Sequence, residues 1–209
     1  MTPANLDPIL KEYSEAARGY DEKWSFYVDS TTRATIARLD ILPTDRILDV
    51  GCGTGELLSR LAAKFPAARL SGLDPVPAML NIARGKLSSN VDLREGWANS
   101  LPWSDDSFDV VVSCNMFHYI THPVDAIHEM GRVLRPGGQL VITDWCDDYF
   151  ACRVCSLYLR LARRAYFKTY HQSECLALLR DAGYFDATIE RYKISWLWGL
   201  LTARAIKPI

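Results

Sequence analysis

Three glycines at alternate positions, directly after an apolar run, constrain the fold of this chain more than any other feature. Residues 47–50 are typical of a buried strand, a helix-like segment begins at Glu56, and between them lie Gly51, Gly53 and Gly55. Glycine permits positive φ and lets a ligand approach the main chain, and the start of a helix offers unpaired N–H groups. This strand–loop–helix unit predicts an α/β fold with a nucleoside-type site at the strand end.

An acid inside the strand end, Asp49, distinguishes between nucleotide-binding loops. A carboxylate there repels phosphate and attracts an amine or a sulfonium. In the dinucleotide motif G-x-G-x-x-G the pyrophosphate lies at the helix N-terminus, but here Gly55 comes one residue early and Glu56 occupies the last position. No Gly-Lys-Ser/Thr follows, so the P-loop motif is absent as well. The loop therefore argues against a nicotinamide oxidoreductase.

The pattern D-x-G-x-G-x-G resembles the first motif of class I S-adenosylmethionine-dependent methyltransferases, of the small-molecule type that acts in ubiquinone and menaquinone biosynthesis. A second strand at residues 69–74 ends in Asp74, which resembles the family's ribose-binding acid, with a simple helix cap as the alternative. Met79 resembles the residue that packs on the adenosine. Trp97 occupies the position of a family acid, where it either stacks on the adenine or only fills the core.

Further matches extend the resemblance over residues 46–145. Residues 101–114 resemble the family's loop and fourth strand, residues 126–138 a helix that ends at Pro-Gly-Gly, and residues 139–145 the fifth strand. The resemblance implies S-adenosyl-L-methionine as cofactor. The residues expected to bind it are Asp49, Gly51, Cys52, Gly53, Gly55, Asp74, Pro75, Met79, Trp97, Ala98, Asn99, Cys114 and Asn115.

The predicted fold is a Rossmann-like, doubly wound α/β sheet of seven strands, mostly parallel, with one antiparallel strand near the C-terminus. The length of 209 residues suits a single methyltransferase domain. We expect four parts within it: an N-terminal helical lid (1–44), a cofactor-binding core (45–145), a substrate-lid insert (146–170) and a C-terminal helix with a β-hairpin (171–209).

The expected reaction is methyl transfer to an O, N or C atom of a small molecule, a class that includes quinone-like and lipid acceptors. His118 is the candidate general base, because histidine titrates near neutrality, and a structural role beneath the cofactor is the alternative. Residues 13–24 resemble a Y-x-x-x-A-x-x-Y-D lid, whose aromatics either wall the acceptor pocket or only pack on the sheet. The predicted substrate residues are Tyr20, Trp24, Tyr119, Trp145, Tyr149 and Tyr170.

Composition restricts partners and location. A net charge of −1 gives no field that favours nucleic acid, and the first residues are too acidic for a signal peptide. The longest apolar run, residues 194–203, is half of the roughly 20 residues that span a bilayer. We expect a cytoplasmic monomer or homodimer. Residues 149–168 have helical spacing with several basic residues, for which an ordinary lid is favoured over membrane contact.

Six cysteines are present, clustered in part at Cys146, Cys152 and Cys155. The C-x-x-C spacing of the last two lacks a second ligand pair, so we expect reduced thiols and no metal. Two alternatives to the small-molecule methyltransferase remain open: a non-catalytic cofactor-binding regulatory subunit, and an arsenite methyltransferase.

Overall fold

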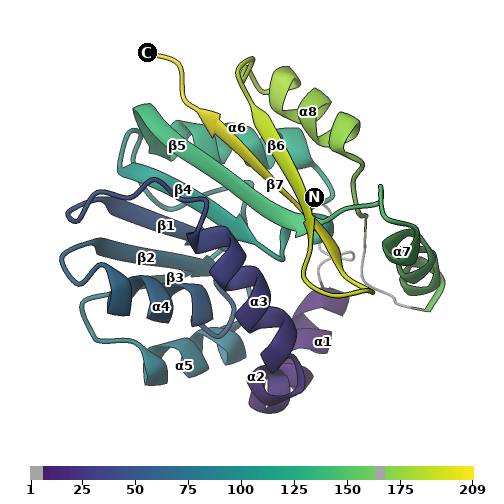
Figure 1. Ribbon diagram of the computed structural model, residues 1–209. Coiled ribbons are helices and arrows are strands. Elements are labelled where there is room, and N and C mark those ends of the chain that lie inside the picture. The colour runs from purple at the N-terminus through teal and green to yellow at the C-terminus, as the bar shows by residue number, and fades with distance from the viewer. Residues whose placement is uncertain (1–6, 163–167) are drawn as a thin grey trace.

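The computed structural model describes residues 7–162 and 168–209, which form a seven-stranded sheet between layers of helices (Figure 1). The strand order is β3-β2-β1-β4-β5-β7-β6. The strands are β1 (Arg46–Val50), β2 (Arg69–Asp74), β3 (Asp92–Glu95), β4 (Phe108–Cys114), β5 (Leu134–Trp145), β6 (Thr188–Lys193) and β7 (Gly199–Ile206).

Strand direction follows the prediction. Strands β3, β2, β1, β4 and β5 pair in parallel, whereas β7 pairs antiparallel with both β5 and β6. The chain runs outward from β1 to β3 and then returns to the middle of the sheet at β4, so the order reverses between β1 and β4. Ligands of open α/β sheets bind at such a reversal, beyond the carboxyl ends of the strands. The predicted fold class is confirmed.

The two faces of the sheet are covered by different helices because apolar side chains alternate along the strands. On one face, Ile47 packs with residues of α3 (Ser25–Ile36), α4 (Glu56–Lys64) and α5 (Pro77–Lys86). On the other face, Leu48 packs with residues of α6 (Pro123–Val133) and α8 (Gln172–Asp181). Both side chains are fully buried, so the central strands are enclosed from both sides.

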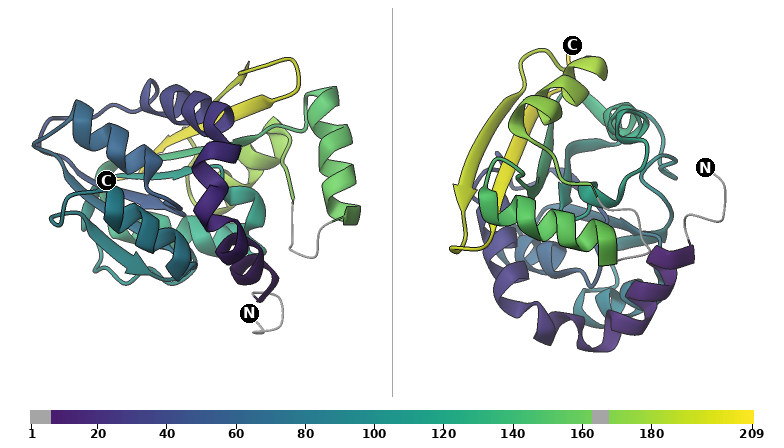
Figure 2. Two further views of the ribbon diagram at one scale, coloured as in Figure 1. Left: turned by 90° about the horizontal axis from the view of Figure 1, so that it is seen from below. Right: turned by 90° about the vertical axis from the view of Figure 1, so that its right-hand side faces the viewer.

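Helices also cross the carboxyl edge of the sheet. Before α3 come α1 (Asp7–Ala16), the short 3-10 helix η2 (Ala17–Gly19) and α2 (Tyr20–Lys23), and a second 3-10 helix, η3 (Phe117–Tyr119), follows β4. Helix α7 (Phe150–Ala162) follows β5 and lies beside the tip of the β6–β7 hairpin in both Figure 1 and Figure 2. The Sγ of Cys152 joins these two elements, since it lies 3.3 Å from the Gly199 carbonyl oxygen.

Two details differ from, or extend, the sequence prediction. Helix α6 ends at Val133, before the Pro-Gly-Gly run, because residues 134–138 already belong to β5, where Leu134 pairs with Phe108. Residues 163–167 of the predicted substrate-lid insert lie outside the described residues. Within the described part of the chain, no helix combines the length and the apolar character needed to cross a membrane.

Candidate functional site

A cavity lies between the carboxyl ends of β1, β2 and β4 and the helices α1, α2 and α3. Of the predicted cofactor residues, all but Gly55 line it: Asp49, Gly51, Cys52, Gly53, Asp74, Pro75, Met79, Trp97, Ala98, Asn99, Cys114 and Asn115. These residues come from four separate stretches of the chain. The fold therefore brings the predicted motifs together at one place.

The glycine loop forms the floor of this cavity. Gly51, Gly53 and Gly55 all have positive φ, at 80°, 52° and 79°. A Cβ on Gly51 would lie 2.3 Å from the Cγ of Met116, whereas a Cβ on Gly53 would meet no atom within 4 Å. Gly51 therefore allows the loop to lie against the segment after β4, and Gly53 leaves bare main chain facing open space.

Gly55 has a different role from its neighbours. It is the N-cap of α4 in the left-handed conformation, and a Cβ there would lie 3.0 Å from the Cβ of Ala83 and from the Cδ1 of Leu87. The absence of a side chain lets α4 begin close to α5. Gly55 thus shapes the loop from behind and does not line the cavity.

Asp49 presents an unusual carboxylate to the cavity. Its side chain is 2% exposed, and no described residue forms a hydrogen bond with its Oδ1. Burial raises the pKa of Asp49 to about 8, and the charge of Asp74 adds to this effect. A buried carboxylate without a partner is destabilising. A cation placed beside it would stabilise the ionised form.

Asp74 is held in one orientation by the main chain. Its Oδ2 accepts a hydrogen bond from the Gly53 N–H at 2.9 Å, and its Oδ1 accepts one from the Val76 N–H at 2.9 Å. Burial raises the pKa of Asp74 to about 6, against the opposing effect of these two N–H groups. Each carboxylate oxygen keeps a lone pair, so the carboxylate can accept further hydrogen bonds from hydroxyl groups. The helix-cap alternative is therefore compatible with a binding role.

An apolar compartment adjoins Asp74. Val76 and Met79 are buried in a small cluster with Ala17 of η2, and Tyr20 packs against that cluster. The segment after β3 also lines the cavity, through Gly96, Trp97, Ala98 and Asn99. A largely apolar lining beside a fixed carboxylate suits a flat aromatic ring attached to a sugar.

A buried polar network attaches helix α3 to the ends of β4 and β5. The Asn115 Oδ1 accepts a hydrogen bond from the Tyr27 hydroxyl at 2.8 Å, and its Nδ2 donates to the Thr31 Oγ1 at 2.7 Å. The indole of Trp145 donates to the same Tyr27 oxygen at 2.5 Å. Asn115 has a φ of 61°, which asparagine tolerates better than most residues. The network fixes the cavity wall where β4 ends.

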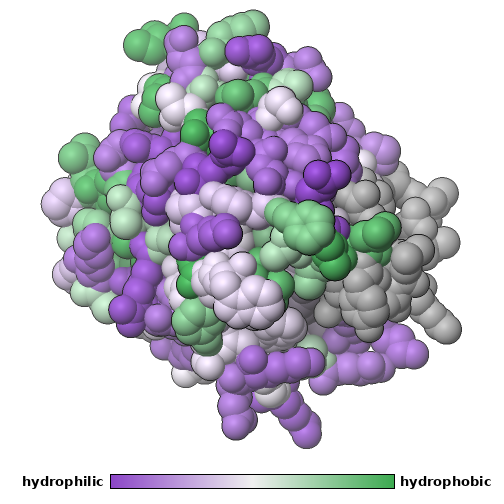
Figure 3. Space-filling model, turned by 45° about the vertical axis from the view of Figure 1, so that its right-hand side comes forward, coloured by the Kyte–Doolittle hydropathy of each residue, from purple (hydrophilic) through white to green (hydrophobic). Residues whose placement is uncertain are grey.

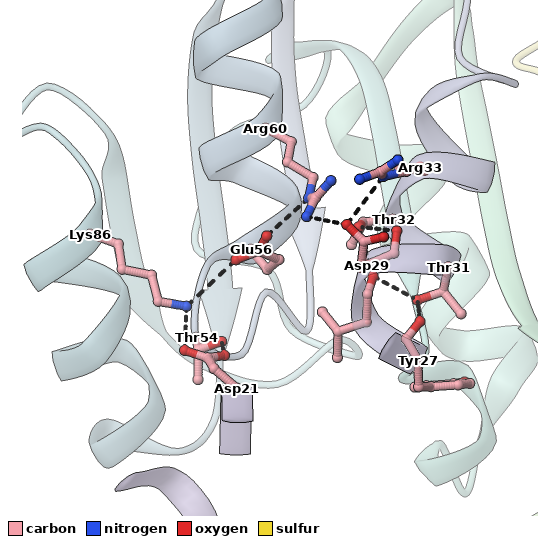
Figure 4. Close-up of polar contacts among 11 residues, drawn as sticks. Asp21, Tyr27, Asp29, Thr31, Thr32, Arg33, Thr54, Glu56, Arg60 and Lys86 are labelled. Atoms are coloured by element: carbon pink, nitrogen blue, oxygen red, sulfur yellow. Dashed lines mark hydrogen bonds and ion pairs between the residues drawn. The ribbon is translucent and has the colours of Figure 1, made fainter. Parts of the chain in front are cut away.

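Ion pairs and a hydrogen bond attach helices α2 and α3 to α4, α5 and the glycine loop (Figure 4). Lys86 of α5 lies 2.5 Å from the Asp21 carboxylate of α2, and the Thr54 hydroxyl donates to Asp21 at 2.6 Å. Arg60 of α4 pairs with Asp29 of α3 at 2.6 Å. These contacts connect α2 and α3 to both helices that follow the loop.

Two tyrosines from distant parts of the chain meet in the cavity wall. The Tyr13 hydroxyl of α1 donates to the Tyr119 hydroxyl at 2.7 Å, and both residues line the cavity together with Tyr20. Burial raises the pKa of Tyr119 to about 12. The phenol therefore stays protonated near neutrality, so it is available as a hydrogen-bonding group and not as a base.

His118, the base predicted from the sequence, does not line the cavity. Its side chain is buried, and its Nδ1 lies 2.7 Å from the Asp144 Oδ1. The His118 backbone N–H also donates to Asp144, at 2.9 Å. The imidazole packs against the Tyr119 ring in a tilted arrangement, with 4.2 Å between ring centroids and an interplanar angle of 51°. The structure thus places His118 against Asp144 and the cavity residue Tyr119, and not among the residues that line the cavity.

The predicted substrate residues divide into three groups. Tyr20 and Tyr119 line the cavity. Trp24 and Trp145 instead belong to an aromatic cluster around Tyr27, which also contains Val28 of the cavity wall. The remaining two lie further away: Tyr149 packs on Gly199 and Tyr170 packs on Phe117.

Some residues of the cavity were missed by the sequence analysis. Thr121 and His122, which follow η3, line the cavity. Ile9 of α1 and Thr32 of α3 line it as well. Their positions depend on how the loops and the N-terminal helices fold over the sheet, and no local motif marks them. All six cysteines are free thiols, and the described residues contain no cluster of histidines, cysteines or acids able to hold a metal ion.

Comparison with known proteins relates this geometry to a family. Residues 47–138 match a family model described as a methyltransferase domain. The demethylmenaquinone methyltransferase of Deinococcus radiodurans is 38% identical over 103 residues, which are 48% of this chain and 43% of that protein. The malonyl-[acyl-carrier protein] O-methyltransferase of a Paenibacillus species is 34% identical over 113 residues, 50% of this chain and 40% of that protein. The chain therefore matches less than half the length of these relatives.

Solved structures show the same fold over nearly the whole chain. The methyltransferase in a complex with the Haloferax volcanii Trm112 methyltransferase activator superposes with a TM-score of 0.85 at 21% identity, covering 95% of this chain and 98% of that one. The phosphoethanolamine N-methyltransferase 2 of Haemonchus contortus, in complex with S-adenosyl-L-methionine, has a TM-score of 0.71 at 17% identity, covering 85% of this chain and 52% of that one. At these identities the similarity concerns the fold alone.

Proposed function

We propose that the protein binds S-adenosyl-L-methionine and transfers its methyl group to a small-molecule acceptor, a proposal supported by the match of residues 47–138 to a family model described as a methyltransferase domain. The observation that carries the proposal is the buried Oδ1 of Asp49, which has no hydrogen-bond partner among the described residues and lies in the wall of the cavity. An unpaired carboxylate in a cavity fits a ligand that carries positive charge.

The other cavity residues fit the remaining parts of this cofactor. The carboxylate of Asp74 is oriented to accept hydrogen bonds from ribose hydroxyls. The lining formed by Met79, Trp97 and Ala98 suits the adenine. The open main chain at Gly53 suits the amino-acid end, whose cationic groups Asp49 would attract. A pyrophosphate is disfavoured because three acids, Asp49, Glu56 and Asp74, line the cavity.

When bound, the cofactor supplies an electrophilic methyl group on a positively charged sulfur. The contribution of the chain is to align an acceptor with that methyl group and to exclude water. Asn115 and the Tyr27 network hold the wall at the end of β4, and the Tyr13–Tyr119 pair bridges from α1 to η3. The lid helices, attached by the Asp21–Lys86 contact, cover the cavity.

An O–H or protonated N–H acceptor must also lose a proton. We propose that His118 acts indirectly, since its Nδ1 is engaged by Asp144 and its ring packs, tilted, against the cavity residue Tyr119. In that role His118 positions Tyr119. A direct role as base would require His118 to reach past Tyr119.

We propose that the acceptor is a small molecule, with quinone-like or lipid compounds as the leading class. The aromatic lining of Tyr13, Tyr20 and Tyr119 supports an acceptor with a flat or apolar body. One of the relatives is named a demethylmenaquinone methyltransferase. We further propose a cytoplasmic monomer or homodimer, and the six free thiols support a reducing compartment.

Calorimetry with S-adenosylmethionine tests cofactor binding. Gly53→Arg would fill the open space beside the loop and bring a cation toward Asp49, so we expect loss of measurable binding. Gly85→Arg is the matched control, because Gly85 lies on the exposed side of α5 with nothing near its Cβ. Equal affinity in wild type and Gly53→Arg would refute the assignment. A methyl-label transfer screen with cell extract then identifies the acceptor, and label in protein or nucleic acid would overturn the small-molecule class.

A further inference from the structure

Helix α7 presents two chemically different faces. Cys152 and Ser156 point inward and are buried, and Cys155 packs against the aromatic cluster that contains Tyr27 and Trp145. On the opposite face, Phe150 is 80%, Val154 54% and Leu157 60% exposed. The spacing of these three residues puts them on one stripe of the helix. An ordinary lid would turn such a stripe toward the protein.

The tip of the β6–β7 hairpin extends this apolar face. Trp196 is 83% exposed, and the turn that carries it is held by the Ser195 Oγ, which accepts hydrogen bonds from the N–H groups of Leu197 and Trp198. Cys152 of α7 bonds to the same hairpin at Gly199. Figure 3 shows hydrophobic side chains grouped on this side of the molecule.

Cations accompany the apolar residues. Arg153 lies on the same stripe of α7 and is exposed, as is Lys193, whose Nζ lies 5.3 Å from the centre of the Tyr149 ring at the start of the helix. In sequence, residues 150–168 contain Arg153, Arg160, Arg163, Arg164 and Lys168 and no acid, in a chain whose net charge is −1.

The two acids that precede α7 in the chain are engaged by internal partners. Asp147 is buried and accepts a hydrogen bond from the Thr169 hydroxyl at 2.5 Å. Asp148 pairs with Arg191 at 3.1 Å and with His171 at 3.0 Å. The surface around Phe150 therefore combines exposed apolar groups with cationic ones, and its charge is complementary to an anionic surface.

We propose that this surface, formed by Phe150, Arg153, Val154, Leu157, Lys193 and Trp196, docks the protein on an anionic lipid bilayer. Apolar side chains on one helical stripe enter the interface between headgroups and acyl chains, and arginine and lysine bind anionic headgroups. Tryptophan is well suited to that depth, because its ring is apolar and its N–H is polar.

Docking at this place brings the bilayer close to the proposed acceptor site. The inner face of α7 contacts, through Cys155, the cluster that includes Tyr119 and Val28, and both of these line the cavity. The docking surface is thus linked to the cavity wall through α7 and this aromatic cluster. A lipid acceptor could then pass from the bilayer to the cavity, and in this respect the proposal rests on the proposed function. Vesicle binding itself can be measured without any turnover.

Co-sedimentation with vesicles tests the proposal. We expect the full chain to bind vesicles that contain phosphatidylglycerol and to bind vesicles of phosphatidylcholine alone only weakly. High salt should release the protein from the anionic vesicles. The triple variant Phe150→Ser, Val154→Ser and Leu157→Ser should lose more than about tenfold in partitioning. Arg153→Glu with Lys193→Glu should lose about fivefold or more for each cation. The tryptophan fluorescence emission of the wild type should shift to shorter wavelength when the protein binds vesicles, and Trp196→Phe should abolish most of that shift.

The matched control replaces exposed apolar residues elsewhere. Leu42 and Phe185, which are 64% and 76% exposed, precede β1 and β6 and so lie at the opposite edge of the sheet. Leu42→Ser with Phe185→Ser should bind vesicles as the wild type does. Absence of vesicle binding, or equal binding by the charge-reversed variant, would overturn the proposal. If the wild type does not bind vesicles but sediments as a dimer, and the triple serine variant sediments as a monomer, the surface is an interface between two copies. Calorimetry with S-adenosylmethionine separates either failure from failure of the proposed function.

Discussion

The pH dependence of cofactor affinity gives the sharpest test of the role of Asp49. Burial raises the pKa of this carboxyl to about 8 in the cofactor-free protein, so the group is largely protonated near neutrality. A cationic ligand binds preferentially to the ionised form. Binding must then drive a proton off Asp49 at pH 7, and affinity should rise with pH until Asp49 is ionised before binding.

The magnitude follows from the pKa. With a pKa of about 8, the ionised fraction of Asp49 rises from about 3% at pH 6.5 to about half at pH 8. The association constant for S-adenosylmethionine should therefore increase about 16-fold over this interval, roughly 1.6 kcal/mol. Asp74, with a pKa of about 6, is mainly ionised throughout this range and adds little.

Calorimetry at several pH values, each in two buffers of different ionisation enthalpy, measures both the affinity and the protons released. Asp49→Asn removes the titrating group while keeping the size of the side chain, so its affinity should be weaker by about 10-fold or more at pH 8. Any pH dependence that comes from the ligand is shared by both proteins. If Asp49→Asn shows the same slope as the wild type, Asp49 is not the group that receives the cation.

The same pKa has the opposite effect on the stability of the cofactor-free protein. Because the folded-state pKa of about 8 lies above the ordinary value of 3.8, the contribution of Asp49 to stability is fully present below about pH 4 and is lost as pH rises through 8. Asp49→Asn should therefore raise the Tm of the cofactor-free protein at pH 8. A lower Tm would show that Asp49 is paired in the free protein.

Three further substitutions test the loop, the lid and the buried histidine. Gly51→Ala should lower the free energy of unfolding by about 1–3 kcal/mol in urea denaturation, since its Cβ would lie 2.3 Å from Met116 and φ is positive; Gly85→Ala, at an open site in α5, should not destabilise. Lys86→Met should speed cofactor dissociation in stopped-flow experiments and weaken its dependence on salt, because it removes the contact that holds α2 to α5; an unchanged rate and salt dependence would argue against a lid that opens there. His118→Asn should cost about 1–3 kcal/mol of stability through the lost bond to Asp144, and the pH optimum of turnover should not move; a shifted optimum with unchanged stability would instead identify His118 as the base.

Local sequence was sufficient for the elements that form the floor of the cavity. The strand ending in Asp49, the turn at Gly51 and Gly53 and the start of α4 are consecutive, so their geometry follows from backbone preferences and alternation within a few residues. The acid at the end of β2 was predictable for the same reason. Because parallel strands end at one edge of the sheet, these neighbouring motifs had to meet there.

Contacts between distant segments could not be derived in this way. The Tyr13–Tyr119 bond and the Asp21–Lys86 pair join parts of the chain that meet only when α1 and α2 fold over the sheet. The placement of His118 is similar: its residue type suggested a base, but the packing of η3 against β5 turned its ring toward Asp144. Such positions depend on packing of the whole molecule and have no local signature.

The sequence by itself determined the fold and the chemistry of the cavity floor, because these depend on short-range spacing and on residue type. Only the tertiary structure decided which side chains close the cavity, which polar group stays unpaired and which face of α7 is exposed. The Asp49 Oδ1, which has no hydrogen-bond partner among the described residues, and the outward stripe of Phe150, Val154 and Leu157 are both such results. Burial and exposure are set by everything that packs around a residue, and no single stretch of sequence contains that information.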